Sequence, residues 1–312
     1  MQFGYHHPSF RVHADALGDG LTDRARWLEA AGFDWFTLMD HLWQLPGVGP
    51  ADEPFVECYT GLAAVAEATE RMRLSALVTC THYRNPGFLA KTVATLDALS
   101  GGRAMLGIGA GWYAAEYEAL GIPFPEPATR IRQLRDVIRL CRAAWSEPSP
   151  VTYAGEFYDL DDLYLEPKPD VPVLVGGAGE QLTLRVVADE ADAWNTIMRS
   201  PERYAHKLDV LRGHCETMGR AFDDIEKTCT VTVVVRSTAE AAHEAFEALA
   251  EPSPREPPSR DEFRGLVGTA EEVAAGVEAY RDLGVDTFQI RVPGNDRESI
   301  ERFVDDVMPE FA

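Results

Sequence analysis

The chain has 312 residues, 46% of them hydrophobic and 26% charged, so it is long enough to bury a large core. Its formal net charge is −22, from 51 acidic residues against 29 Lys plus Arg. Such a surface repels nucleic acid and anionic lipid, and we expect neither as a partner. This charge is typical of halophilic proteins, because concentrated salt screens their self-repulsion. The alternative is an acidic protein from a GC-rich, Arg-favouring genome, since only four of the 29 cations are Lys.

The sequence shows no sign of a membrane or secreted protein. No apolar run approaches the roughly 20 residues that span a bilayer. Residues 1–5 carry neither the basic region nor the apolar stretch of a signal peptide. The five cysteines are odd in number and lack CxxC spacing, which argues against a disulfide framework or a zinc site. We therefore expect a cytoplasmic protein without a bound metal.

Strand-like apolar runs alternate with amphipathic helical segments along the chain. The predicted strands cover residues 2–7, 33–39, 73–80, 104–109, 171–175, 191–197, 228–235 and 286–292. The predicted helices cover residues 21–31, 55–69, 86–99, 128–146, 180–189, 201–218, 238–249, 270–283 and 296–309. Gly32, Gly101 and Gly284 follow helices and act as C-cap signals, and Asn85-Pro86 opens one.

Eight strand–helix units in a chain of this length predict an α/β fold, a (β/α)₈ TIM barrel. A doubly wound sheet would need only five or six strands and a marked switch point. Residues 150–169 interrupt the alternation with a predicted hairpin, and the proline-rich segment 251–258 reads as a loop. Nothing marks a domain boundary, so we expect one domain over residues 1–312, with insertions after strands 2, 4 and 7.

The most informative segment is Phe36-Thr-Leu-Met-Asp40-His41, where an apolar strand ends in an acid and an imidazole. Groups at the C-terminal ends of barrel strands face the active site. Histidine is suited to proton transfer near neutral pH, and an adjacent carboxylate can orient or charge it. The alternative is an Asp-His pair that only caps the next turn.

Two glycine-rich runs also follow predicted strands. Gly107-Ile-Gly-Ala-Gly111-Trp112 does not meet the GxGxxG spacing; its glycines allow either close approach of a ligand or crowding by neighbouring strands. Val175-Gly-Gly-Ala-Gly179 precedes a helix, and its N–H groups with the helix N-terminus predict a phosphate site rather than a simple tight turn.

Other polar and aromatic residues follow strand ends with less specific signals. Arg84 is either an anion ligand or half of a surface pair. Further proton-transfer candidates are His82, His6 and His7, although isolated histidines there are more often structural. Four aromatic residues are candidates for the wall of a flat ligand's pocket: Trp43, Trp112, Tyr113 and Trp194. No nucleophile or phosphate-loop motif of the GxSxG or Walker type is present, so the pattern favours redox chemistry.

Taken together, these motifs resemble the luciferase-like monooxygenase superfamily, in particular its probable coenzyme F420-dependent oxidoreductases. The resemblance rests on the order of Met39-Asp-His41, Tyr83-Arg-Asn-Pro-Gly, Leu96-Asp-Ala-Leu-Ser-Gly-Gly-Arg103, Gly107-Ile-Gly-Ala-Gly-Trp112 and Val175-Gly-Gly-Ala-Gly179, and extends to Val267-Gly-Thr-Ala-Glu-Glu272. It implies a TIM barrel with a deazaflavin or flavin in its mouth. It also implies a non-prolyl cis peptide bond at the end of the third strand, at Thr79-Cys80.

The resemblance implies roles for individual residues. His41 would be the base for a substrate hydroxyl, and Asp40 would contact the cofactor. The acid that follows the GxGxG run in the deazaflavin dehydrogenases corresponds to Trp112 here; Glu116, one helical turn on, either replaces it or caps a helix. The expected cofactor-binding residues are Asp40, Thr79, Cys80, Gly109, Ala110, Gly111, Trp112, Gly176, Gly177, Ala178 and Gly179.

The sequence therefore predicts an F420-dependent oxidoreductase that moves a hydride between the deazaflavin and a small organic molecule, with His41, Asp40 and Glu116 as catalytic candidates. One alternative is an FMN-dependent monooxygenase that uses reduced flavin and O₂. The other is a barrel that binds flavin or deazaflavin without turnover. We expect a homo-oligomer, in the form of a dimer.

Overall fold

The computed structural model describes residues 1–8, 16–46, 48–197, 200–249 and 265–312. The proline-rich segment 251–258, predicted as part of an insertion, lies outside the described residues. None of the described helices is long and apolar enough to cross a membrane.

Parallel strands form a closed barrel in chain order, which confirms the predicted fold class. The wall consists of β1 (Gln2–His7), β2 (Trp35–Leu38), β3 (Arg73–Ala76) continued by β4 (Thr79–Cys80), β5 (Leu106–Gly109), β8 (Val173–Gly176), β9 (Ala193–Ile197), β10 (Glu226–Val235) and β12 (Thr287–Arg291). The ring closes where β4 pairs with β5 and where Leu74 bridges Ala104. The C-terminal ends of all these strands therefore meet at one mouth.

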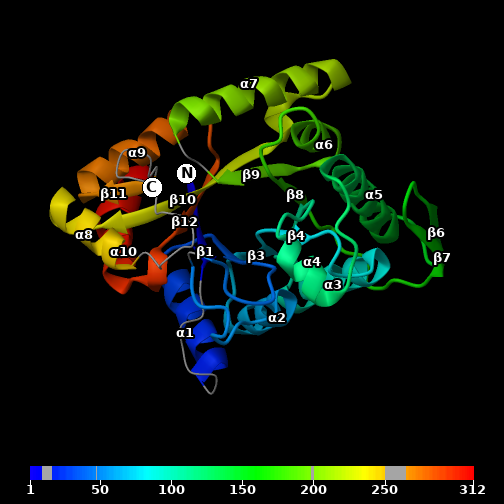
Figure 1. Cartoon of the computed structure of the whole chain (residues 1–312), viewed down its shortest axis with the longest axis horizontal. Helices are drawn as coiled ribbons and strands as arrows, with labels where there is room; N and C mark the ends of the chain where they lie inside the picture. Colours follow the sequence, from blue (N-terminus) through cyan, green and yellow to red (C-terminus); the bar gives the residue numbers. More distant parts are fainter. Residues whose placement is uncertain (9–15, 47, 198–199, 250–264) are drawn as a thin grey trace.

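Helices surround the strands (Figure 1). They are α1 (Leu17–Ala30), α2 (Cys58–Ala68), α3 (Pro86–Ser100), α4 (Ala114–Leu120), α5 (Pro127–Ser146), α6 (Thr183–Glu190), α7 (Pro201–Met218), α8 (Ala239–Leu249), α9 (Ala270–Asp282) and α10 (Arg297–Arg302). Gly32 and Gly101 follow α1 and α3 with φ of 98° and 69°, so the predicted stops are confirmed. The two termini lie together, with the Met1 ammonium 3.4 Å from the Phe311 carbonyl.

Several elements differ from the prediction. The expected third strand, 73–80, is divided in two, because Leu77 and Val78 form a bulge between β3 and β4. Helix α4 and the short strand β11 (Leu266–Gly268) were not predicted. The hairpin expected in 150–169 is present as β6 (Val151–Ala154) and β7 (Asp159–Leu163) beyond α5 (Figure 1). The final helix continues from α10 through a π-helical turn, Phe303–Val307, and a 3₁₀ turn, Met308–Phe311.

The Leu96–Arg103 motif has a structural role. The Arg103 guanidinium donates hydrogen bonds to the carbonyls of Ala66, Thr69 and Met72, which lie at the end of α2 and just beyond it. These carbonyls lack partners within the helix, and a cation there also opposes the negative end of the helix dipole. Arg103 thus fixes the junction between α2 and β3, away from the barrel mouth.

The interior of the barrel is filled below the mouth. Trp35, Met105, Leu174 and Ala193, from β2, the start of β5, β8 and β9, form a buried apolar cluster, and the bulge residues Leu77 and Val78 pack against it. A much larger core lies between the strands and the surrounding helices. This cluster fills the barrel below the bulge, and the cavity at the mouth lies above it.

Candidate active site at the barrel mouth

A cavity of about 510 Å³ opens at the C-terminal ends of the strands. Most predicted site residues line it: Asp40, His41, Thr79, Cys80, Gly109, Ala110, Gly111, Trp112, Gly176 and Gly177. Ala178 and Gly179 follow directly but are not in the lining, and Glu116 lies behind His41. The sequence thus located the mouth correctly, whereas the role of each residue depends on its contacts.

The bulge between β3 and β4 contributes Leu77 and Val78 to the cavity floor. The non-prolyl cis peptide bond lies between these two residues, so the predicted position at Thr79-Cys80 is wrong. Thr79 and Cys80 already pair with β5 and belong to the resumed strand. The irregular backbone therefore begins two residues before the position expected from the sequence.

Glycines around the bulge make room for protein atoms rather than for a ligand. A Cβ on Gly109 would lie 2.8 Å from a methyl of Val78, and one on Gly176 would meet Val78 at the same distance. A Cβ on Gly107 would lie 2.1 Å from the carbonyl oxygen of Ala76. Of the two interpretations of this run, crowding by a neighbouring strand is the one that these contacts support.

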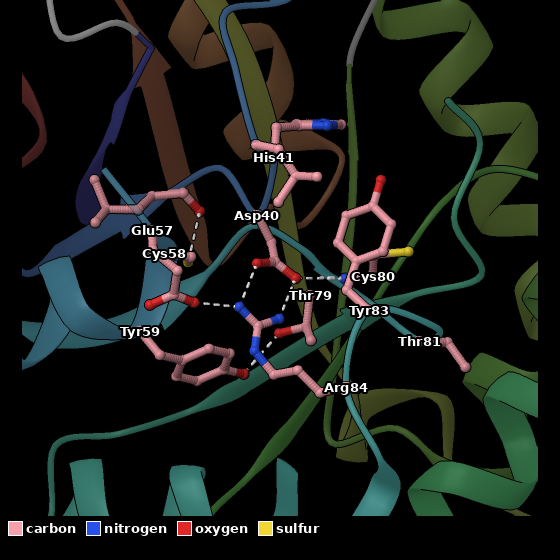
Figure 2. A network of polar contacts seen from close by, with 12 residues as sticks. Asp40, His41, Glu57, Cys58, Tyr59, Thr79, Cys80, Thr81, Tyr83 and Arg84 are labelled. Atoms are coloured by element: carbon pink, nitrogen blue, oxygen red, sulfur yellow. Dashed lines mark hydrogen bonds and ion pairs between the residues drawn. The ribbon is translucent and has the colours of Figure 1, made fainter. Parts of the chain in front are cut away.

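Asp40 belongs to a network that ties the bulged strand to two loops (Figure 2). Its carboxylate accepts two hydrogen bonds from the Arg84 guanidinium, at 2.8 and 2.9 Å, and one from the Cys80 N–H at 2.9 Å. Arg84 also pairs with Glu57 and lies over the Tyr59 ring. Asp40 therefore holds the backbone of β4, and Arg84 is engaged in ion pairs inside the protein rather than available to an anion.

The half-buried His41 and the buried Glu116 form a pair at the cavity wall. Glu116 Oε2 lies 2.7 Å from His41 Nδ1, and Oε1 accepts the Leu42 N–H at 2.6 Å. The Tyr83 hydroxyl donates to the same carboxylate. Burial raises the pKa of Glu116, but these hydrogen bonds outweigh it and the net pKa is lowered. Glu116 therefore stays ionised and positions His41 instead of capping α4.

Of the aromatic residues predicted to form the pocket wall, some lie at the cavity and one lies in the protein core. Trp112 and Tyr113 line the cavity and lie against His41, at ring-centroid distances of 5.9 and 6.3 Å. Trp43 contacts Tyr113 at the edge of this group. Trp194 is fully buried and stacks on Tyr204 at 5.4 Å, so its predicted place in the pocket wall is wrong. A continuous apolar strand end does not reveal which face a tryptophan takes.

The turn after β8 is the predicted phosphate site, and its backbone hydrogen bonds show which N–H groups are engaged. Gly177 has φ of 135°, and its N–H and carbonyl are held by the Asn195 carbonyl and the Trp194 indole. Within the described part of the chain, no hydrogen bond engages the N–H of Ala178 or Gly179. These two donors, just before α6, remain for a phosphate, whereas the Gly177 N–H does not.

The other histidine candidates lie in different surroundings. His82 donates or accepts through both ring nitrogens, to the Tyr117 hydroxyl and Gln133, and does not line the cavity. His6 does line it, with Nδ1 2.9 Å from Thr37 Oγ1. Burial, and next to it the positive charge of Arg291, lowers the pKa of His6 to about 3. His6 is therefore a neutral hydrogen-bonding group at the mouth.

The sequence interpretation missed Tyr83 as a partner of Glu116, and it missed the polar wall formed by β9, β10 and β12. That wall includes Asn195, Thr230 and Arg291. The sequence did contain a signal for Arg291. It is a charged residue at the end of an apolar strand, as Asp40 is after the run of β2. The sequence contained no such signal for Asn195 and Thr230, because polar residues within a strand are common.

The matches to known proteins agree with this architecture. The family model of luciferase-like monooxygenases matches residues 1–287, and the chain belongs to this family. It is 30% identical to the F420-dependent glucose-6-phosphate dehydrogenase of Kineococcus radiotolerans, over 96% of this chain and 95% of that protein. A second relative, from Kribbella flavida, carries the same name and is 29% identical over 96% of this chain. With relatives named as dehydrogenases over nearly its whole length, this chain is an oxidoreductase.

Solved structures share the whole fold at low sequence identity. An F420-dependent secondary alcohol dehydrogenase, in complex with an F420–acetone adduct, superposes with a TM-score of 0.83 at 21% identity and covers 100% of this chain and 99% of its own. A riboflavin lyase with modified FMN and riboflavin gives a TM-score of 0.82 at 18% identity, over 100% and 91%. At these identities the likeness shows the fold alone.

Proposed function

We propose that this protein is an F420-dependent oxidoreductase that transfers a hydride between the deazaflavin and a small alcohol or carbonyl compound. The observation that carries the proposal is the His41–Glu116 pair at the cavity wall, at 2.7 Å. A proton-transfer group held in a fixed orientation is what alcohol oxidation or carbonyl reduction requires of the protein. The curated relative from Kineococcus, named as an F420-dependent dehydrogenase, supports the choice of cofactor.

His41 is the proposed acid–base residue. An ionised carboxylate only accepts hydrogen bonds, so the contact with Glu116 places the proton of neutral His41 on Nδ1. The other ring nitrogen, Nε2, is then the basic atom, and among the described residues no hydrogen bond engages it. It can take the hydroxyl proton as an alcohol is oxidised, or return it as a carbonyl is reduced, while Glu116 stabilises the imidazolium.

The cavity fits a flat cofactor with a phosphate. Leu77 and Val78 offer an apolar floor, and the unengaged N–H groups of Ala178 and Gly179 offer donors to the phosphate. Asp40 and Arg84 hold the backbone that follows this floor. When bound, the deazaflavin supplies a hydride acceptor or donor at C5, and it reacts scarcely with O₂ because carbon replaces the N5 of a flavin.

The proposal is tested by anaerobic and aerobic assays of purified protein. With oxidised F420 and a panel of small alcohols, we expect at least one alcohol to bleach the absorbance of the cofactor at the same rate with and without O₂. The alternative function, an FMN-dependent monooxygenase, predicts O₂ consumption with reduced FMN and substrate instead. Binding of F420 without turnover on a broad panel would favour the non-catalytic alternative.

A further inference from the structure

Arg291 lines the cavity, and among the described residues no carboxylate pairs with it. It ends β12 and lines the cavity, and its hydrogen bond within the described residues runs from Nη2 to Thr232 Oγ1 at 2.9 Å. Burial lowers the pKa of its guanidinium. Other enclosed arginines at strand ends have carboxylates, such as Arg84 with Asp40 and Arg236 with Asp296 at 2.9 Å. Arg291 therefore differs from these arginines in the part of the chain that the structure describes.

Arg291 is half-buried, and an anionic ligand would supply the opposing charge that its neutral partner lacks. Enclosing a charge with one neutral partner forfeits hydration without an opposing charge. Of the five N–H donors of a guanidinium, the hydroxyl of Thr232 accepts one bond. The rest suit the paired oxygens of a carboxylate or phosphate, which guanidinium binds in a planar, two-pronged manner. The cavity is therefore arranged for an anionic ligand group near β12.

This cation lies near the proposed proton-transfer group. His6, on the neighbouring strand β1, lines the same cavity as Arg291 and His41. A small molecule could thus contact Arg291 at one end and His41 at the other, with the neutral His6 between them. Two described acids at the cavity are already engaged, Asp40 by Arg84 and Glu116 by His41.

We propose that Arg291 binds an anionic group of the substrate, either a carboxylate or a phosphate, while the hydroxyl or carbonyl of the same substrate faces His41. This inference rests on the proposed function. The substrate class is then a small hydroxy or oxo compound with a negative charge at its other end. The anionic group takes no part in the reaction and only positions the substrate. Because the deazaflavin also carries a phosphate, the experiment must distinguish these two sources of anionic oxygen.

The test measures binding to the cofactor-free protein, so it does not depend on turnover. Calorimetric titrations use inorganic phosphate, lactate and 3-hydroxybutyrate as probes, with lactamide as the neutral counterpart of lactate. Arg291→Gln should weaken the best anionic probe by about 10- to 100-fold and leave lactamide unchanged. Arg291→Lys should restore part of the affinity, because it keeps the charge and loses the planar fork. Arg236→Gln is the matched control and should leave probe affinity unchanged.

Thermal unfolding without ligand gives a second readout. Arg291→Gln should keep or raise Tm, because it removes an uncompensated charge, whereas Arg236→Gln should lower Tm by breaking ion pairs. Equal affinity of the anionic probes for wild type and Arg291→Gln, or a clear fall in Tm of this variant, would overturn the inference. So would a loss of affinity for F420 alone, which would assign Arg291 to the cofactor phosphate. Turnover of neutral alcohols without anion binding would leave the proposed function intact.

Discussion

The Nδ1 atom of His41 lies 2.7 Å from Oε2 of Glu116, although 75 residues separate them in the sequence. His41 lies just beyond the end of β2, and Glu116 lies in the first turn of α4, which follows β5 in the chain. Glu116 is fully buried, and it also binds the backbone N–H of Leu42 and the hydroxyl of Tyr83. The orientation of the proposed acid–base residue is therefore fixed by a carboxylate that the solvent does not reach.

Replacing either member of this pair should impair turnover more than cofactor binding. His41→Ala should lower turnover by roughly 10²–10⁴-fold, as expected for a general acid or base. Glu116→Gln should lower it by about 10-fold or more, because the amide accepts a hydrogen bond but does not stabilise an imidazolium. Steady-state kinetics and F420 titration measure both effects. His206→Ala, at an exposed histidine, is the control; unchanged turnover in His41→Ala would refute the role.

The turn at Gly177 should be needed for binding the cofactor phosphate. Gly177→Val places a β-branched side chain at φ of 135°, where a Cβ would also lie 3.1 Å from Thr183. The strained turn would move the neighbouring N–H groups, so affinity for F420 should fall at least about 10-fold at a stability cost of about 1–3 kcal/mol. Fluorescence titration and thermal unfolding measure these quantities. Gly213→Val, in an open position of α7, should bind normally; equal affinities of the two variants would contradict the assignment.

The periodic parts of the fold were predictable from the sequence because each strand and helix carries its own pattern. Alternation of strands and helices gave the barrel, and the residues at the end of β2 indicated the mouth. The bulge was not predictable, since Leu77 and Val78 continue the apolar run without a break. Its position depends on contacts from other strands, such as Cys80 N–H to Asp40 and Val78 against Gly109 and Gly176.

The sequence indicated where the candidate site residues gather, but it did not show which of them contact one another. The Asp40-His41 pair was visible, but its two members serve different partners, Arg84 and Glu116. Such pairings join distant segments, and neither spacing nor periodicity encodes them. Glu116 was a candidate only through the family resemblance, and in the structure its carboxylate contacts His41 and the Leu42 N–H.

Stability should fall as the pH drops below about 6.5. Burial, with the charge of Arg291, lowers the pKa of His6 from its ordinary value of 6.5 to about 3. Between these values the unfolded chain takes up a proton and the native protein does not, so acid favours unfolding by up to about 1.4 kcal/mol per pH unit. Urea unfolding from pH 7.5 to 5 should show this loss, and His6→Gln should show a shallower slope. Parallel profiles for the two proteins would contradict the prediction.

Low ionic strength should also destabilise the protein. With a net charge of −22, unscreened repulsion opposes the compact state. The Debye length grows from about 3 Å at 1 M salt to about 30 Å at 0.01 M, so distant carboxylates then repel one another. We expect Tm to fall by several degrees or more from molar to millimolar KCl. A Tm that does not change over this range would reject the salt-adaptation hypothesis.

The most direct test of the account is a titration of the cofactor-free protein with F420 and, separately, with FMN. Binding is followed by the fluorescence of each chromophore, and O₂ uptake is recorded after reduction of the bound cofactor. We expect F420 to bind much more tightly than FMN and the reduced complex to consume little O₂. Tight binding of FMN without measurable binding of F420, together with O₂ consumption when reduced flavin and substrate are supplied, would contradict the proposed function.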